Sequence, residues 1–111
     1  MSDEAGGRHR LCGVDEVAPG RMAQVQVDGV GCLAVYNIDG RFYATDDGCT
    51  HSAGSLSEGD LEDDVVVCPV HFGMFHVPTG KALGYPAEVD VRTYVVETDD
   101  RDVFVVTGGP S

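Results

Sequence analysis

Two short pairs of metal-ligating side chains constrain this chain more than any other feature. Cys49 and His51 are separated by one residue and Cys68 and His71 by two, with sixteen residues between the two pairs. Thiolate and imidazole groups are common ligands of zinc and iron in proteins. Glycine and proline lie in and around both pairs, and they favour loops over regular secondary structure. A fold for this chain therefore has to bring two loops together around one metal site.

The ligand types alone leave two kinds of metal site open, because two cysteines and two histidines also form structural zinc sites. Zinc sites commonly separate their first two ligands by about two to four residues, whereas a single residue separates Cys49 from His51. A Cys-x-His step projects its ligands in directions that suit two metal atoms better than one tetrahedron. The spacing favours a binuclear cluster, and a zinc-stabilised binding module without a redox role is the alternative.

The rest of the chain predicts β-structure. Runs that alternate apolar and polar residues, or that are rich in β-branched residues, occupy residues 22–27, 30–37, 41–44, 91–97 and 103–106. Asp28-Gly29 and Asp39-Gly40 are strong hairpin signals, and Asp99-Asp100 is a third probable turn. We expect an all-β fold, a small antiparallel β sandwich or barrel that carries a loop-rich cluster-binding subdomain.

The length of 111 residues fits one domain. Residues 1–10 are small and charged, so we expect a flexible N-terminal leader there and the folded domain at residues 11–107. The four candidate ligands all fall between about residues 45 and 87, which we therefore expect to form the cluster-binding subdomain.

The charge of the chain limits its partners. Asp and Glu number 19 against 7 Lys and Arg, for a net charge of −12. Such a chain is repelled by nucleic-acid phosphates and by anionic membranes, which excludes nucleic-acid binding and favours partner proteins with basic surfaces. The sequence has no apolar run long enough to span a bilayer and no signal-peptide pattern at its start. We therefore expect a cytoplasmic protein with reduced thiols.

The pattern Cys49-x-His51, sixteen residues, Cys68-x-x-His71 resembles the signature of Rieske [2Fe–2S] proteins. The resemblance extends over about residues 14–106. It implies one [2Fe–2S] cluster, with Cys49 and Cys68 bound to the inner iron and His51 and His71 bound to the outer iron. Because neutral imidazoles replace two thiolates, the site is less negative and accepts an electron more easily, at roughly −150 to +300 mV.

The chain departs from the Rieske proteins of respiratory complexes, in which a disulfide joins the two ligand loops. The matching positions here are Gly54 and Val70, so that bridge cannot form. Those proteins also use a serine and a tyrosine to donate hydrogen bonds at the cluster, whereas Phe72, Gly73 and Phe75 stand at the corresponding positions. Fewer donors stabilise the added electron less, so we expect a potential of roughly −150 mV.

Residues 68–75 and 79–82 resemble the ferredoxin components of bacterial aromatic-ring dioxygenase systems. This resemblance implies an electron carrier that is not an enzyme, which accepts electrons from an NADH-dependent flavoprotein reductase and delivers them to a terminal oxygenase. A monomer suits a carrier that docks with two partners in turn. The small subunit of an assimilatory nitrite reductase is the alternative function.

Other notable residues have simpler interpretations. We expect the nearness of Cys12 to His9 to be coincidental and not a metal pair, Cys32 to be a small buried apolar residue of a strand, and His76 to be satisfied by the backbone. The acidic residues at 46–47 and 58–64 have two interpretations: they form solvated turns, or they place negative charge near the cluster and steer a basic partner.

Overall fold

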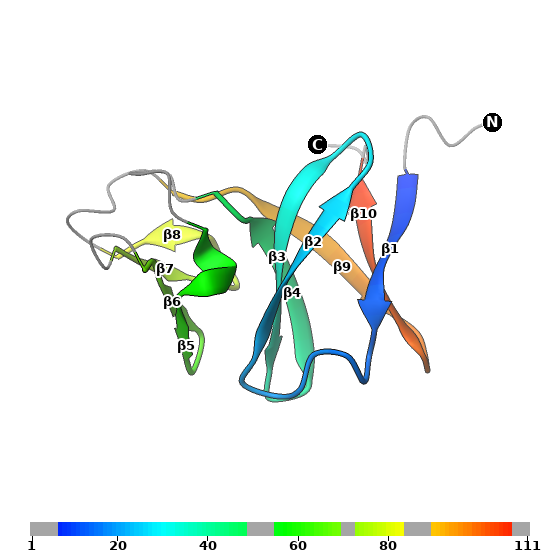
Figure 1. Ribbon diagram of the computed structural model, residues 1–111, viewed down its shortest axis with the longest axis horizontal. Helices are drawn as coiled ribbons and strands as arrows, with labels where there is room; N and C mark the ends of the chain where they lie inside the picture. The colour runs from blue at the N-terminus through cyan, green and yellow to red at the C-terminus, as the bar shows by residue number, and fades with distance from the viewer. Residues whose placement is uncertain (1–6, 49–54, 70–72, 84–89, 108–111) are drawn as a thin grey trace.

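The computed structural model describes residues 7–48, 55–69, 73–83 and 90–107, which form strands and one short 3-10 helix (Figure 1). The elements are β1 (Gly7–Gly13), β2 (Met22–Val27), β3 (Gly31–Ile38), β4 (Arg41–Asp46), η2 (Leu56–Glu58), β5 (Asp60–Glu62), β6 (Val65–Val67), β7 (Met74–His76), β8 (Lys81–Ala82), β9 (Thr93–Thr98) and β10 (Asp102–Thr107). A six-stranded sheet has the order β1-β10-β9-β4-β3-β2, and a four-stranded sheet has the order β5-β6-β7-β8. The expected all-β architecture is confirmed.

The meander of β2, β3 and β4 forms where the alternation and the Asp-Gly turns predict it. Asp39 and Gly40 both have positive φ, at 58° and 92°, as a type I′ hairpin turn requires. The side chain of Asn37 fixes this turn, because its Oδ1 accepts from the Gly40 N–H at 2.9 Å and its Nδ2 donates to the Val17 carbonyl at 2.8 Å.

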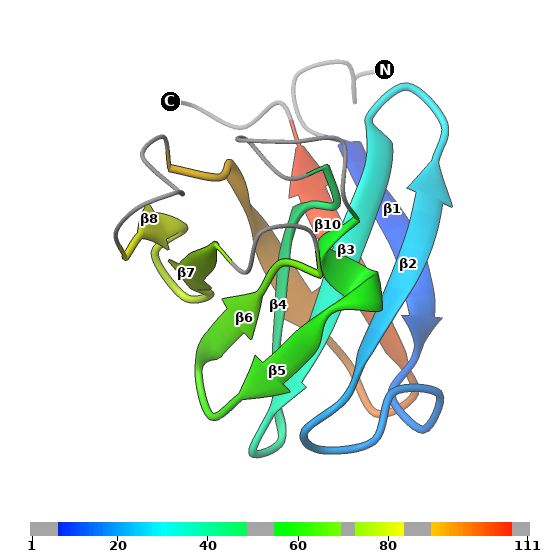
Figure 2. The same ribbon diagram turned by 60° about the vertical axis from the view of Figure 1, so that its left-hand side comes forward.

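Strand β3 is buried on both faces because it serves two cores. Leu33 and Val35 face one core, which is enclosed by the large sheet. Ala34 and Tyr36 face the other core, which lies between the large sheet and the small one. Figure 2 shows the small sheet in front of this part of the large one. The small sheet is therefore packed directly against the central strand of the meander.

The expected leader is wrong for residues 7–10, which belong to β1. This strand pairs with β10 at the edge of the sheet, from Gly7 opposite Thr107 onward. The Arg8 guanidinium lies 3.9 Å from the centre of the Phe104 ring. The pairing slips by one residue between Arg10 and Cys12, and a bulge of this kind lets the consecutive residues Leu11 and Cys12 both be buried.

The predicted hairpin near residues 99–100 is also present, between β9 and β10. Asp99 accepts hydrogen bonds on Oδ1 from the backbone N–H groups of Arg101, at 2.8 Å, and Asp102, at 2.7 Å. Within the part of the chain that the structure describes, no helix has the length and apolar character needed to cross a membrane.

Candidate metal centre

Cys68 is the one predicted ligand that falls on described residues, whereas Cys49, His51 and His71 lie outside them. Cys68 follows directly after β6 and is 0% exposed. Its backbone N–H donates to the Gly73 carbonyl at 2.8 Å. This bond joins the two ends of the segment that contains His71.

The segment that contains Cys49 and His51 also has its two ends joined. Gly48 and Ser55 form an isolated antiparallel bridge on either side of it. One residue further out, the Leu56 N–H donates to the Asp47 carbonyl at 2.7 Å. Both ligand-bearing segments therefore begin and end at a hydrogen-bonded base.

The bases of the two segments share one apolar cluster. Leu56, at the first base, and Cys68, at the second, pack in the same buried core with Val66 and Phe75. A thiolate buried among apolar side chains requires a compensating positive charge, which an iron atom supplies. The buried thiol and the shared core fit a cluster that is held jointly by the two segments.

Asp47 departs from the expected role of a surface charge, because it is only 2% exposed. Its Oδ2 accepts from the Gln24 Nε2 at 2.6 Å, and its Oδ1 accepts from the Ser57 N–H at 2.8 Å. Burial alone would raise the pKa of Asp47. Hydrogen bonds from Gln24, Ser57 and Ser55 outweigh this effect and hold the pKa below its usual value. Asp47 is therefore a buried carboxylate that accepts hydrogen bonds from β2 on one side and from η2 on the other.

The predictions for the remaining cysteines and for His76 are partly wrong. Cys12 lies in β1 and is buried, which raises the pKa of its thiol. Cys32 is half-buried, with its Sγ 3.9 Å from Oδ2 of Asp47. Partial burial and the Asp47 carboxylate both raise the pKa of the Cys32 thiol.

The imidazole of His76 is held by side chains rather than by the backbone. Its Nε2 lies 3.0 Å from Oδ2 of Asp64, and its Nδ1 lies 2.8 Å from Oγ1 of Thr79. This network ties the β5–β6 turn to the turn that follows β7. Among the described residues, no group of three or more His, Cys, Asp or Glu side chains is arranged to bind a metal ion.

Two surfaces flank the small sheet. Glu58 at the end of η2 and Asp60, Glu62 and Asp63 of the β5–β6 hairpin are exposed, as expected for an acidic surface. Toward the other side of the sheet, Met74 in β7 and Leu83, which follows β8, are each 43% exposed. The Leu83 N–H donates to the Met74 carbonyl at 2.9 Å, so these two apolar side chains belong to neighbouring chain segments.

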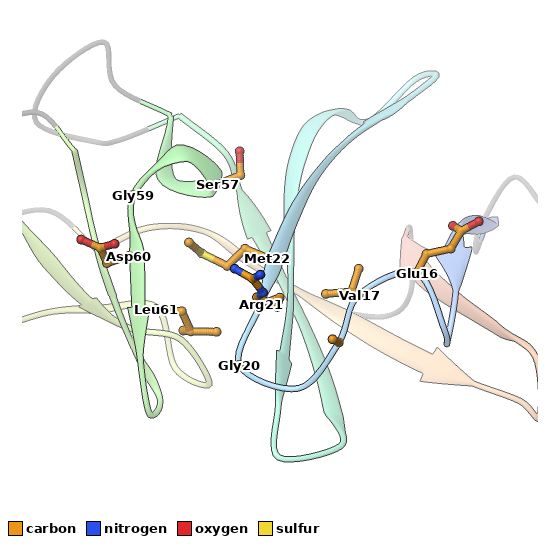
Figure 3. Close-up of a pocket in the computed structure, with 10 residues that line it drawn as sticks. Glu16, Val17, Gly20, Arg21, Met22, Ser57, Gly59, Asp60 and Leu61 are labelled. Carbon is orange, nitrogen blue, oxygen red and sulfur yellow. The ribbon is translucent and has the colours of Figure 1, made fainter.

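A pocket of about 520 Å³ opens between the chain entering β2 and the segment from η2 to β5 (Figure 3). Glu16, Arg21 and Asp60 give it a mixed charge, and Met22 and Leu61 add apolar surface. Cys68 is not among its lining residues. Among the described residues, the pocket therefore contains no predicted ligand of the cluster.

Comparison with known proteins places these features in a family. The family model described as "Rieske [2Fe-2S] domain" matches residues 7–95. The biphenyl 2,3-dioxygenase ferredoxin component of Rhodococcus jostii (strain RHA1) is 45% identical over 96 residues, which cover 86% of this chain and 89% of that protein.

Solved structures agree with the sequence comparison. A chain in the complex of reduced oxygenase and oxidised ferredoxin of carbazole 1,9a-dioxygenase has a TM-score of 0.85 and 38% identity, over 94% of this chain and 95% of that one. The putative nitrite reductase small subunit from Mycobacterium tuberculosis has a TM-score of 0.80 at 23% identity, over 91% and 95% of the two chains, and at that identity shows the shared fold alone.

Proposed function

This chain belongs to the Rieske [2Fe–2S] domain family, and from that membership we propose that it is the ferredoxin of a bacterial aromatic-ring dioxygenase system. It is an electron carrier and is not itself an enzyme. We propose that it receives electrons from an NADH-dependent flavoprotein reductase and delivers them to a terminal oxygenase. The observation that carries this proposal is the 45% identity to a dioxygenase ferredoxin over 86% of the chain.

The cofactor is one Rieske-type [2Fe–2S] cluster, which supplies a one-electron redox couple when it is bound. We propose that Cys49 and Cys68 hold the inner iron and that His51 and His71 hold the outer iron. The hydrogen-bonded bases at Gly48–Ser55 and Cys68–Gly73 support this assignment, because they bring the ends of each ligand-bearing segment together. The family match disfavours the zinc module.

The described residues contribute a buried apolar surface on the protein side of this centre. Cys68 is packed with Leu56, Val66 and Phe75, all of them fully buried. Water excluded from this side cannot solvate the thiolate, so the hydrogen bonds and the apolar wall provided by the chain control the electrostatic environment of the sulfur.

The partner surface is proposed to combine an apolar patch with an acidic one. Met74 and Leu83, six and one positions after Cys68 and Ala82 in the sequence, have exposed side chains. Apolar contacts of this kind add affinity without fixing a long-lived complex. The acidic β5–β6 hairpin adds long-range attraction to a basic partner. A carrier that must bind and release two proteins benefits from both.

The proposal is tested by purifying the protein anaerobically and recording its metal content and EPR spectrum. We expect a red-brown protein with iron and acid-labile sulfide, silent in EPR when oxidised and active when reduced. Cys68→Ser should lose the cluster, whereas Cys12→Ala, which changes a cysteine outside the motif in β1, should retain it. A colourless protein loaded with zinc would refute the assignment.

Reconstitution distinguishes the two partner systems. With NADH and a dioxygenase-type flavoprotein reductase, the protein should be reduced and should then support product formation by a terminal aromatic-ring oxygenase. Electron delivery only to a nitrite reductase would favour the alternative function. Cytoplasmic location and the monomeric state remain predictions, to be checked by cell fractionation and by sedimentation.

A further inference from the structure

Asp47 occupies an unusual place for a carboxylate. It follows directly after β4, is almost completely buried, and receives hydrogen bonds from two different elements. Oδ2 is bonded by Gln24 of β2, and Oδ1 by the backbone N–H of Ser57 in η2. A buried carboxylate is unfavourable unless its oxygens are satisfied, so this position is specified by its partners rather than by packing alone.

The backbone of Asp47 forms two further bonds. Its N–H donates to the Cys32 carbonyl at 3.0 Å, and its carbonyl accepts from the Leu56 N–H at 2.7 Å. Asp47 therefore links β2 and β3 on one side to residues 56–57 on the other. These partners stand before and after the segment that contains Cys49 and His51.

A neutral amide could not replace this carboxylate without loss. Oδ1 and Oδ2 each accept from a separate N–H donor, whereas an asparagine has only one acceptor oxygen. The geometry thus requires an acceptor in both directions, toward the large sheet and toward η2. Leu56, which η2 places in the same core as Cys68, connects this junction with the second ligand-bearing segment.

We propose that Asp47 is a positioning residue, which clamps both ends of the 49–54 segment to the large sheet and so fixes the ligand pair Cys49 and His51 relative to Cys68. This inference rests on the proposed ligand assignment. Groups that orient metal ligands in this way commonly change metal retention when they are removed, although they do not touch the metal.

The experiment compares cluster-loaded variants of the full chain. Asp47→Ala removes both acceptors, and Gln24→Glu sets two carboxylates against each other. Adding Asp47→Asn to Gln24→Glu restores one donor and one acceptor across this contact, while the amide oxygen still faces the Ser57 N–H. Asp60→Asn, at an exposed position on β5, is the control for the loss of one negative charge.

Three readouts are recorded: the rate of cluster loss to a chelator, the line shape of the reduced EPR spectrum, and the reduction potential. Asp47→Ala should lose its cluster about 10–100 times faster than the unchanged protein. Its EPR spectrum should broaden or shift, and its potential should change. Gln24→Glu should be affected in the same direction, its combination with Asp47→Asn should recover most of the original rate, and Asp60→Asn should match the unchanged protein.

A role in stability alone would produce a different pattern. Lower unfolding midpoints with an unchanged EPR line shape and potential would overturn the inference, as would equal effects of Asp60→Asn. If Asp47→Ala does not fold, Gln24→Ala carries the test, since Gln24 is at the surface and its loss removes one of the two donors. No change in any readout for Gln24→Ala would then contradict the clamp.

The same experiment separates this inference from the proposed function. If the unchanged protein lacks a Rieske EPR signal, or if Cys68→Ser keeps its cluster, the ligand assignment itself is wrong. If both behave as expected while the Asp47 and Gln24 variants are silent, the assignment stands and only the positioning role is refuted.

Discussion

Gly80→Ala should destabilise the protein through a close backbone approach between the small sheet and the strand that returns to the large one. A Cβ atom on Gly80 would lie 2.2 Å from the Val91 carbonyl oxygen and 2.8 Å from Cγ2 of Thr93. Val91 is buried, and its N–H donates to the Gly80 carbonyl at 2.8 Å, so neither backbone segment can move aside freely.

Two costs add at this position. Gly80 has a φ of +76°, and an alanine in that region costs about 1–2 kcal/mol. Overpacking against rigid neighbours costs a further ~1–3 kcal/mol. The sum of about 2–5 kcal/mol is a large part of the ~5–15 kcal/mol typical of a small domain.

Urea unfolding of the cluster-loaded protein, followed by circular dichroism, measures this loss as a lower midpoint with an unchanged slope. Gly29→Ala is the matched control, because Gly29 has a φ of +79° and a Cβ there would meet nothing within 4 Å. The control should show only the backbone cost of about 1–2 kcal/mol. Equal losses in the two variants would refute the close-approach argument.

Three further predictions concern redox behaviour and pH. The reduction potential, measured by EPR-monitored titration, should lie near roughly −150 mV, and a value above about 0 mV would contradict the argument from missing hydroxyl donors. Electron transfer from the reductase should slow as the salt concentration rises, because the charges of the exposed acidic side chains of the β5–β6 hairpin are screened beyond ~8 Å at physiological ionic strength. Stopped-flow rates that do not depend on salt concentration would argue against electrostatic steering. The backbone N–H groups of Arg101 and Asp102 lower the pKa of Asp99, so its stabilising contribution is complete above its ordinary pKa and is lost as pH falls through the lowered value. Asp99→Asn should therefore flatten the fall in unfolding midpoint below pH ~4, and an unchanged pH profile would exclude this role.

Much of the large sheet could be predicted because its signals are local. Alternation in residues 22–27 and the two Asp-Gly turns define the meander without reference to distant residues. Strand β1 could not be predicted in this way, because Arg8 and Arg10 leave its first residues without a hydrophobic pattern. Arg8 lies over Phe104, and Arg10 bonds to Asp102, which is 92 positions away in the sequence.

The metal centre likewise has features with a local sequence signal and features that depend on residues distant in the sequence. The ligand motif is visible because its spacing is short, and the family match now supports the cofactor. Asp47 carries no such signal in the sequence, because the partners that bury it lie 23 and 10 positions away. The side-chain partner of His76 is equally invisible in the sequence, since Asp64 comes from another hairpin.

The pairing of β1 with β10 has a consequence for how the protein is made. Strand β1 is synthesised before the other strands, yet its hydrogen-bonding partner β10 is synthesised after all of them. Until β10 has been synthesised, the apolar side chains of β1 have no lasting cover and the edge of β9 stays open. We therefore expect chains truncated before β10 to aggregate or to be degraded instead of folding into a smaller carrier.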